Sequence, residues 1–139
     1  MTSSNREFEV STRGVGLADM TSLVQGAVAE TGVMEGLVTV FIRHTSASLV
    51  IQENADPGVQ VDLEAFLQRL VPEGDPLWTR TSEGPDDLPA HVRSALTATS
   101  LGIPVTGGEL ALGTWQGVYR WERRHTPHRR RVVVNVSGI

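Results

Sequence analysis

The chain has 139 residues, of which 40% are hydrophobic and 20% charged, and this composition indicates one globular domain spanning residues 1–139. The formal net charge of −4 weighs against general nucleic-acid binding, and the absence of cysteine excludes disulfides, thiolate metal sites and cysteine nucleophiles. All twelve basic residues are arginine, which excludes chemistry that forms a Schiff base on a lysine.

No apolar run approaches the length of a bilayer-spanning helix. Residues 1–10 carry no basic stretch followed by an apolar one, which is the pattern of a secretory signal. We therefore expect a cytoplasmic protein that makes no membrane contact.

The N-terminal residues 6–13 alternate between apolar and polar side chains, which predicts a half-buried strand near a sheet edge. Gly14-Val15-Gly16 follows and resembles the start of a dinucleotide-binding loop. The third glycine of that pattern is replaced by Asp19, which argues against such a loop.

Apolar residues at three- and four-residue spacing predict a helix over 19–31, and Gly32 supplies its stop. The β-branched run 36–42 predicts a central strand. Small polar residues interrupt the apolar pattern at 43–48, and 49–51 resumes a strand.

Two further helices are expected, at 59–70 and 87–99. The expected buried stripe of the first is Val59, Leu63, Phe66, Leu67 and Leu70. The expected buried stripe of the second is Leu88, Val92, Ala95 and Leu96.

Short apolar runs at 103–105 and 110–112 and strands at 114–123 and 130–137 complete the chain. Strands outnumber helices without regular alternation. The expected fold class is therefore α+β, with mostly antiparallel sheets in a compact sandwich-like core and about three helices.

Polar side chains occur at four places where the periodicity predicts apolar ones: 44–48, 53–56, 83–91 and 115–116. Each place alone suits a structural hydrogen-bond network that pins the sheet together. Four such places in one small domain also indicate a cleft.

The stretch 83–91 combines three carboxylates with a histidine at the start of a predicted helix. Asp86 or Asp87 can cap this helix, and Asp87 and His91 are four residues apart, so they share one helix face. This pair suits acid–base chemistry or metal binding, but it equally suits an ordinary capped surface helix.

Half of the arginines lie in the last twenty residues, at 120, 123, 124, 129, 130 and 131. Such a cluster can be a solvated face, a nucleic-acid patch or a phosphate clamp.

The ordered motifs His44-Thr-Ser-Ala-Ser, Glu53-Asn-Ala-Asp-Pro, Glu83-Gly-Pro-Asp-Asp-Leu-Pro-Ala-His and Gly113-Thr-Trp-Gln-Gly resemble the YjbQ-like family, described as secondary thiamine-phosphate synthases. The likeness covers roughly residues 8–138. It implies a homotrimer of compact α+β domains. It also implies an enzyme that joins hydroxymethylpyrimidine pyrophosphate to a thiazole phosphate and releases pyrophosphate.

The resemblance also implies roles for particular residues. Proton transfer would fall to His44, His91 and Asp87. A divalent metal, magnesium or zinc, would be held by His44, His91 and Asp86, with Asn54, Asp56 and Asp87 as further ligands or their hydrogen-bond partners. The small phosphorylated substrate would contact Ser46, Asn54, Arg80, Trp115, Gln116, Glu122, Arg130 and Arg131.

The sequence departs from the family at Arg80, where relatives usually carry a histidine. Arginine stays protonated and cannot bind a metal, so a three-histidine zinc site is in doubt. Two histidines with a carboxylate, or direct anion binding by Arg80, are the alternatives.

A non-catalytic protein that binds a metal or a phosphorylated metabolite would use the same residues. A serine hydrolase using Ser46 beside His44 lacks the nucleophile-elbow pattern. His125 and His128 are expected to be solvated in a turn.

Overall fold

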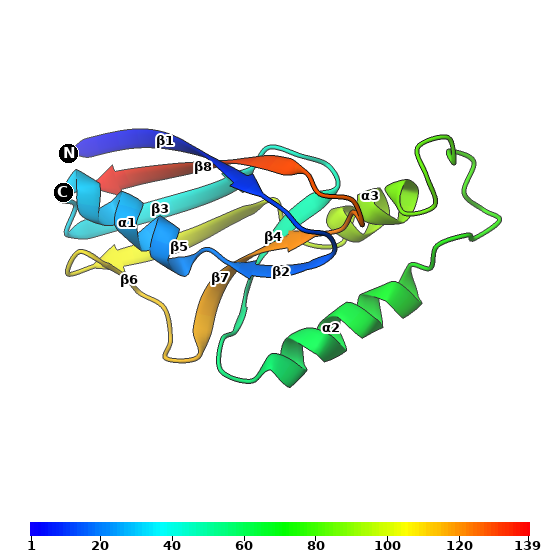
Figure 1. Cartoon of the computed structure of the whole chain (residues 1–139). Coiled ribbons are helices and arrows are strands. Elements are labelled where there is room, and N and C mark those ends of the chain that lie inside the picture. The colour runs from blue at the N-terminus through cyan, green and yellow to red at the C-terminus, as the bar shows by residue number, and fades with distance from the viewer.

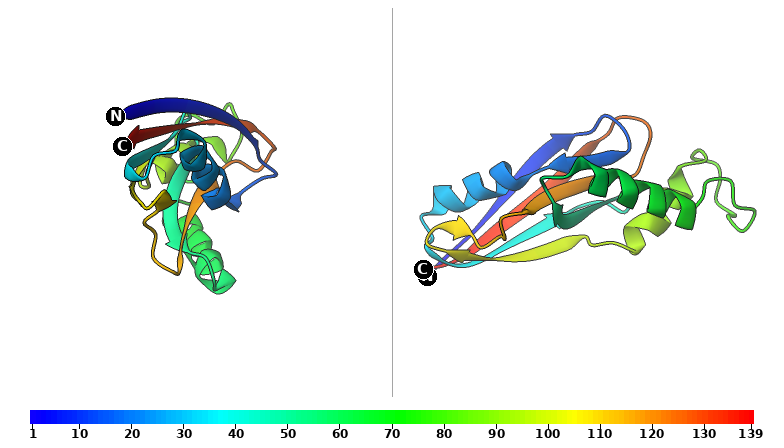
Figure 2. Two further views of the ribbon diagram at one scale, coloured as in Figure 1. Left: turned by 90° about the vertical axis from the view of Figure 1, so that its left-hand side faces the viewer. Right: turned by 90° about the horizontal axis from the view of Figure 1, so that it is seen from below.

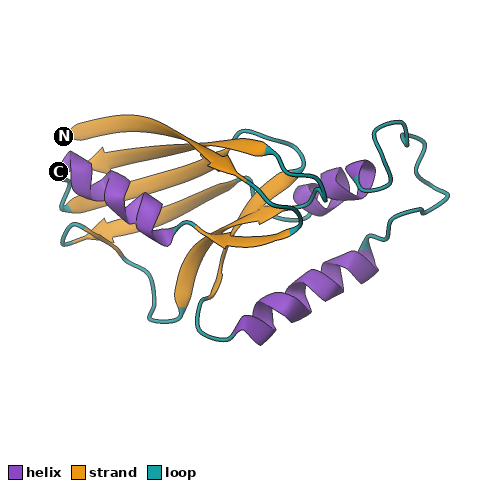
Figure 3. Ribbon diagram, viewed as in Figure 1, coloured by secondary structure: helices purple, strands orange, loops and turns teal.

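The computed structural model describes all residues from 1 to 139 and contains eight strands and three helices (Figure 3). The strands are β1 (Thr2–Ser11), β2 (Gly16–Asp19), β3 (Glu35–Ile42), β4 (Ala47–Glu53), β5 (Ser100–Thr106), β6 (Glu109–Leu110), β7 (Gln116–Glu122) and β8 (Arg129–Gly138). The helices are α1 (Thr21–Thr31), α2 (Pro57–Leu70) and α3 (Asp87–Ala95).

Every strand pairing is antiparallel, and the strands form two sheets. The larger sheet has the order β1-β8-β3-β5-β6, and the smaller has the order β2-β7-β4. The sheets curve around α1 as a half-barrel (Figures 1 and 2). The expected α+β class, with antiparallel sheets and three helices, is confirmed.

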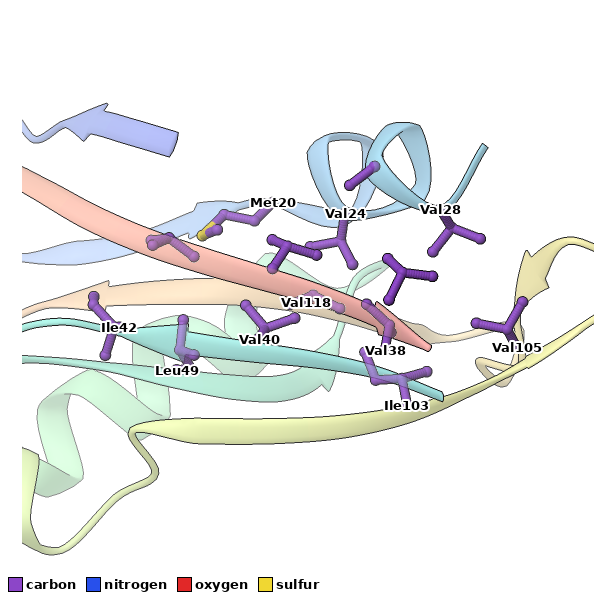
Figure 4. Close-up of a cluster of buried hydrophobic side chains, with 14 of the residues drawn as sticks. Met20, Val24, Val28, Val38, Val40, Ile42, Leu49, Ile103, Val105 and Val118 are labelled. Atoms are coloured by element: carbon purple, nitrogen blue, oxygen red, sulfur yellow. The ribbon is translucent and has the colours of Figure 1, made fainter. Parts of the chain in front are cut away.

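The hydrophobic core fills the space between α1 and the two sheets (Figure 4). Val24 and Val28 on α1 are fully buried, as are Val38 and Val40 on β3. The strand β3 lies in the middle of the larger sheet, although Leu37 and Phe41, on the face turned away from the core, are exposed. The expected central strand is therefore confirmed.

The strand β2 was not expected, because residue 19 was assigned to the following helix. Asp19 instead pairs with Tyr119 of β7, and the amide of Met20 donates to the carbonyl of Val118. The helix therefore begins at Thr21, whose amide donates to Asp19 Oδ1 at 2.8 Å. It ends as expected, at Gly32 with φ of 72°.

The expected buried stripe of α2 is wrong at Phe66 and Leu70, while Val59 and Leu63 are half-buried. Only Leu67 is buried among the residues of this helix, while Phe66 and Leu70 are each 56% exposed. The helix extends away from the larger sheet (Figure 1), and part of its apolar face stays exposed.

The expected extent and buried face of α3 are also wrong. The helix ends at Ala95, and Leu96 is 58% exposed. Its buried side chains include Asp87, Arg93 and Ser94. Arg93 is accommodated because its Nε and Nη2 both donate to the carbonyl of Val71, at 3.2 and 2.6 Å.

None of the three helices combines the length and hydropathy required of a membrane-spanning segment.

Candidate functional site

Two histidines from distant parts of the chain line one cavity of about 230 Å³. His44 lies in the connection between β3 and β4, and His91 lies on α3. The other lining residues are Thr45, Ser94, Ala95 and Thr99. The cavity therefore lies between the connection that precedes β4 and the helix α3.

The tautomer of His44 follows from its contacts with Ser46. The backbone amide of Ser46 donates to His44 Nδ1 at 3.0 Å, and the Ser46 hydroxyl lies 3.0 Å from the same nitrogen. Because an amide can only donate, Nδ1 is the unprotonated nitrogen. Neutral His44 therefore carries its proton on Nε2.

The pKa of His44 is lowered, first because part of the ring is desolvated and then because of the charge of Arg130. Glu122 acts in the opposite direction without reversing this shift. The imidazole therefore stays neutral to lower pH than an ordinary histidine.

Behind His44 lies a buried ion pair. Arg130 Nε and Nη2 donate to the two oxygens of Glu122, each at 2.6 Å, and Arg130 Nη2 also donates to Ser46 Oγ at 3.2 Å. The side chains of Arg130 and Glu122 are 1% and 0% exposed. Since Ser46 accepts from Arg130, its own proton is free to point at His44.

Glu122 and Arg130 thus support His44 from the protein side instead of lining the cavity. Burial would raise the pKa of Glu122, but hydrogen bonds from Arg130 and from the amides of Arg124 and Arg123 outweigh it, so the pKa is lowered.

The second histidine has the opposite tautomer. His91 Nδ1 lies 3.1 Å from the carbonyl oxygen of Thr45, which can only accept, so Nδ1 carries the proton. His91 Nε2 lies 3.5 Å from Asp87 Oδ1. In the neutral ring, Nε2 is therefore a free base, and a proton placed there would be stabilised by a nearby carboxylate.

Sequence reasoning missed Arg124 as a partner of the acidic residues. Its Nε donates to Asp86 Oδ2 at 3.1 Å, and its Nη1 donates to Asp87 Oδ1 at 2.8 Å. It also donates to the carbonyl of Glu83 at 3.1 Å. Nothing in the sequence distinguishes this arginine from the five others of the C-terminal cluster.

Asp86 starts α3 without capping it through its side chain. Its Oδ2 accepts from the amide of His125 at 2.8 Å as well as from Arg124. Burial would raise the pKa of Asp86, but these two donors outweigh it, so the pKa is lowered.

The donor set implied for a divalent metal does not fit the arrangement of these residues. His44 Nδ1 accepts from Ser46, so the remaining nitrogen carries a proton, and the Asp86 carboxylate is taken by Arg124 and His125. No group of three or more His, Cys, Asp or Glu residues is placed to hold a metal ion. The metal therefore stays a prediction that this geometry does not favour.

Three expected site residues lie away from the cavity, where β7 begins and β4 ends. Asn54 Nδ2 donates to the carbonyl of Gln116 at 3.3 Å, and Gln116 Oε1 accepts from the amide of Gly113 at 2.7 Å. Trp115 is 62% exposed. Asp56 lies nearby, where it caps α2 by accepting from the amide of Gly58.

The remaining expected contacts are also separated from the histidines. Arg80 is exposed in the connection between α2 and α3, 3.7 Å from Glu83. Arg131 is exposed on β8. Ser46 is completely buried, so no substrate reaches it as a nucleophile.

Ser94 was not expected at the cavity, because the predicted inward face of α3 was apolar. It is 4% exposed, and its hydroxyl is buried without a hydrogen-bond partner. Ser94 lines the cavity, and its hydroxyl is the one buried side-chain polar group of the lining residues without a partner.

Comparisons with known proteins place the chain among close relatives. The model of the family described as "UPF0047 protein YjbQ-like" matches residues 6–139. A UPF0047 protein of Synechocystis is 55% identical over 129 residues, which are 93% of this chain and 88% of the relative. The YjbQ protein of Escherichia coli O157:H7 is 41% identical over 103 residues, or 74% of each chain.

Solved structures of members of this family have the same fold. A crystal structure of a YjbQ/UPF0047 family protein from Clostridium acetobutylicum is 36% identical and has a TM-score of 0.87, with 95% of this chain and 99% of that chain covered. A protein from Sulfolobus solfataricus, described as YbjQ-like and of unknown function, has a TM-score of 0.87 at 20% identity, so it shows the fold alone.

These descriptions correct the expected thiamine-phosphate synthase activity. Neither the family description nor the names of the relatives carry that activity, and the Sulfolobus protein is described as having no known function. What the motifs identify correctly is the family. With a family match that extends from residue 6 to the last residue, the chain belongs to the UPF0047 YjbQ-like family.

Proposed function

We propose that the cavity between His44 and His91 is a catalytic site for proton transfer on a small molecule. The observation that carries this proposal is the pair of complementary tautomers on its walls. His44 offers a proton on Nε2 and His91 offers a lone pair on Nε2. A donor and an acceptor on one cavity are what base-catalysed chemistry requires.

His91 is the general base. Its Nδ1–H bond to Thr45 fixes the ring, which keeps Nε2 available for a proton from the substrate. After the transfer, the imidazolium lies 3.5 Å from Asp87, and this contact stabilises the charge. Asp87 is itself held by Arg124, so it keeps its position during the transfer.

His44 is the partner that stabilises negative charge on a substrate oxygen. A neutral imidazole that donates from one nitrogen can polarise a carbonyl without being charged beforehand. The lowered pKa of His44 favours this neutral form. The substrate class is therefore a small carbonyl compound that loses a proton beside the carbonyl group.

The volume of the cavity, about 230 Å³, suits a molecule of a few carbon atoms. The binding of a phosphorylated metabolite stays a prediction. No arginine lines the cavity to hold a phosphate group. Phosphate esters of the same carbonyl compounds therefore belong in the test.

The test is incorporation of solvent deuterium. The protein is incubated in D₂O with small ketones, aldehydes and their phosphate esters, and exchange is followed by proton NMR. We expect at least one compound to exchange faster than in buffer. We expect His91→Ala to lower the rate by about 100-fold or more, and His44→Ala to lower it by about 100-fold.

The control is His125→Gln, because His125 is exposed and contacts Glu73 outside the cavity. It should leave the exchange rate unchanged. Nitrogen-15 NMR of the histidine rings provides a separate check of the tautomers, with the proton of the neutral ring on Nε2 in His44 and on Nδ1 in His91. Exchange no faster than in buffer for every compound, or full activity in His91→Ala, would refute the proposal.

We also propose that the chain assembles as a homotrimer, the state that the family resemblance implies. The exposed apolar side chains of α2, including Val61, Phe66 and Leu70, support an assembly interface because water otherwise covers them.

A further inference from the structure

A second cavity, of about 330 Å³, lies between the connection of β1 to β2 and the strand β7. It shares no lining residue with the cavity of His44 and His91. Its walls include Arg13, the backbone of Gly14 to Gly16, and Arg120, and no acidic residue lines it. The charge on its walls is therefore entirely positive.

Arg120 is buried without a negatively charged partner. The residue is 5% exposed, yet its guanidinium donates only one hydrogen bond, from Nη1 to the carbonyl of Ser11 at 3.3 Å. Its buried Nε has no hydrogen-bond partner. Buried arginines are almost always paired, so a missing partner indicates a place for one.

The nearby carboxylate does not neutralise Arg120. Glu122 lies on the same face of β7, but both of its oxygens accept from Arg130. The amides of Arg123 and Arg124 also donate to Glu122 Oε2. Arg130 therefore takes the one nearby carboxylate, and Arg120 is left without an ion pair.

One of the two glycines of the connection, Gly16, gives the cavity an open wall. Gly14 and Gly16 have φ of +133° and +147°, which L side chains rarely adopt. A Cβ at Gly16 would meet nothing within 4 Å, so the backbone there faces open space. A ligand can therefore approach the main chain closely beside the two arginines.

We propose that this cavity binds a small oxyanion, either phosphate or carboxylate, through Arg120 and Arg13. The guanidinium of Arg120 has only one hydrogen bond of its own, to Ser11, and its fork of N–H groups matches either anion in a planar geometry. Arg13, on the exposed connection, closes over the bound anion from the solvent side. The bound anion supplies the negative charge that the chain itself does not give to Arg120.

Isothermal titration calorimetry of the full chain tests the site. Sodium phosphate and sodium acetate are titrated separately at constant ionic strength, which distinguishes a phosphate ligand from a carboxylate ligand. We expect saturable binding of at least one of them at one ion per chain. Arg120→Gln should weaken it by about tenfold or more, and Arg13→Gln by a smaller factor.

Two controls keep the result specific. Arg69→Gln removes an exposed arginine from the last turn of α2 and should leave binding unchanged. His91→Ala should also leave it unchanged, because the two cavities are separate. If Arg120→Gln does not fold, as judged by circular dichroism, Arg13→Gln decides the outcome.

No saturable binding of either anion to the wild-type protein would overturn the proposal. So would full affinity in Arg13→Gln and Arg120→Gln, or loss of binding in His91→Ala, since that would place the anion in the other cavity. The proton-transfer proposal stands or falls separately, because its own test measures deuterium exchange.

Discussion

Glu122 and Arg130 form the most buried charged contact of the molecule, and they support His44 through Ser46. Removing two charges from water is costly, and the bidentate geometry with both bonds at 2.6 Å offsets that cost. The amides of Arg123 and Arg124 complete the coordination of the carboxylate. Removing either residue would leave the charge of the other buried and unpaired, which would destabilise the fold.

Arg130→Met should destabilise the protein by about 3–5 kcal/mol, because it leaves the Glu122 carboxylate buried without its cation. Urea unfolding followed by circular dichroism measures this change. The double variant Glu122→Leu with Arg130→Met should recover part of the loss. A single variant as stable as the wild type would contradict the importance of the pair.

The two histidines illustrate what can be predicted about single residues from sequence. The polar interruption after β3 and the Asp87–His91 spacing both marked unusual positions, and the structure places His44 and His91 on one cavity. Their tautomers depend on an amide and a carbonyl, which every sequence position possesses. No sequence pattern could have indicated them.

At the scale of elements, α3 is tied to the chain that follows β7 by a salt bridge. Asp86, at the start of the helix, accepts from Arg124 and from the amide of His125. This contact fixes the helix that carries His91. Its strength depends on the charge of the carboxylate, which makes it sensitive to acid.

The lowered pKa of Asp86 gives that sensitivity a definite sign. The unfolded chain binds a proton more readily than the folded one, so the stabilisation is complete above the ordinary value of 3.8 and is lost as the pH falls through the folded value. Asp86→Asn should lower stability at pH 7 and flatten its fall below pH 4. Urea midpoints measured from pH 7 to pH 3 test this.

Glu83→Gln is the matched control, since Glu83 is exposed and interacts with the cluster only through its backbone carbonyl and a 3.7 Å contact with Arg80. Glu83→Gln should show the same dependence of the urea midpoint on pH as the wild type. If the urea midpoint of Asp86→Asn changed with pH in parallel with that of the wild type, the carboxylate would not contribute to the pH dependence of stability.

The elements also show where periodicity succeeds and fails. The strand β3 follows from its apolar run, but only Val38, Val40 and Ile42 face the core, while Leu37 and Phe41 on the opposite face are exposed. The predicted buried faces of α2 and α3 are wrong in part, since α3 buries Asp87 and Arg93, which find partners elsewhere in the chain, and α2 leaves Phe66 and Leu70 exposed. Hydrophobic spacing cannot reveal a hydrogen-bond partner far away in the chain.

At the scale of the whole molecule, two curved sheets enclose α1, while α2 projects from them (Figure 2). The exposed side chains Phe66 and Leu70 lie on the projecting helix. This shape leaves an apolar surface without cover in a single chain. The homotrimer proposal would bury it.

Light scattering coupled to size-exclusion chromatography tests the assembly. We expect the wild type at three times the chain mass of 15.0 kDa, and Phe66→Glu at the mass of a single chain. Arg69→Gln, another change at an exposed residue of α2, is the control and should keep the trimer. A wild-type protein that elutes as a single chain would refute the proposal.

The antiparallel pairing of β1 with β8 has one further consequence. Thr2 lies opposite Gly138, so the two ends of the chain are neighbours (Figure 1). A short glycine-rich linker could join them, and new ends could be opened in the exposed connection near Leu77, which is 79% exposed. Such a circularly permuted protein should keep both sheets, while its order of synthesis would place α3 first and α2 last.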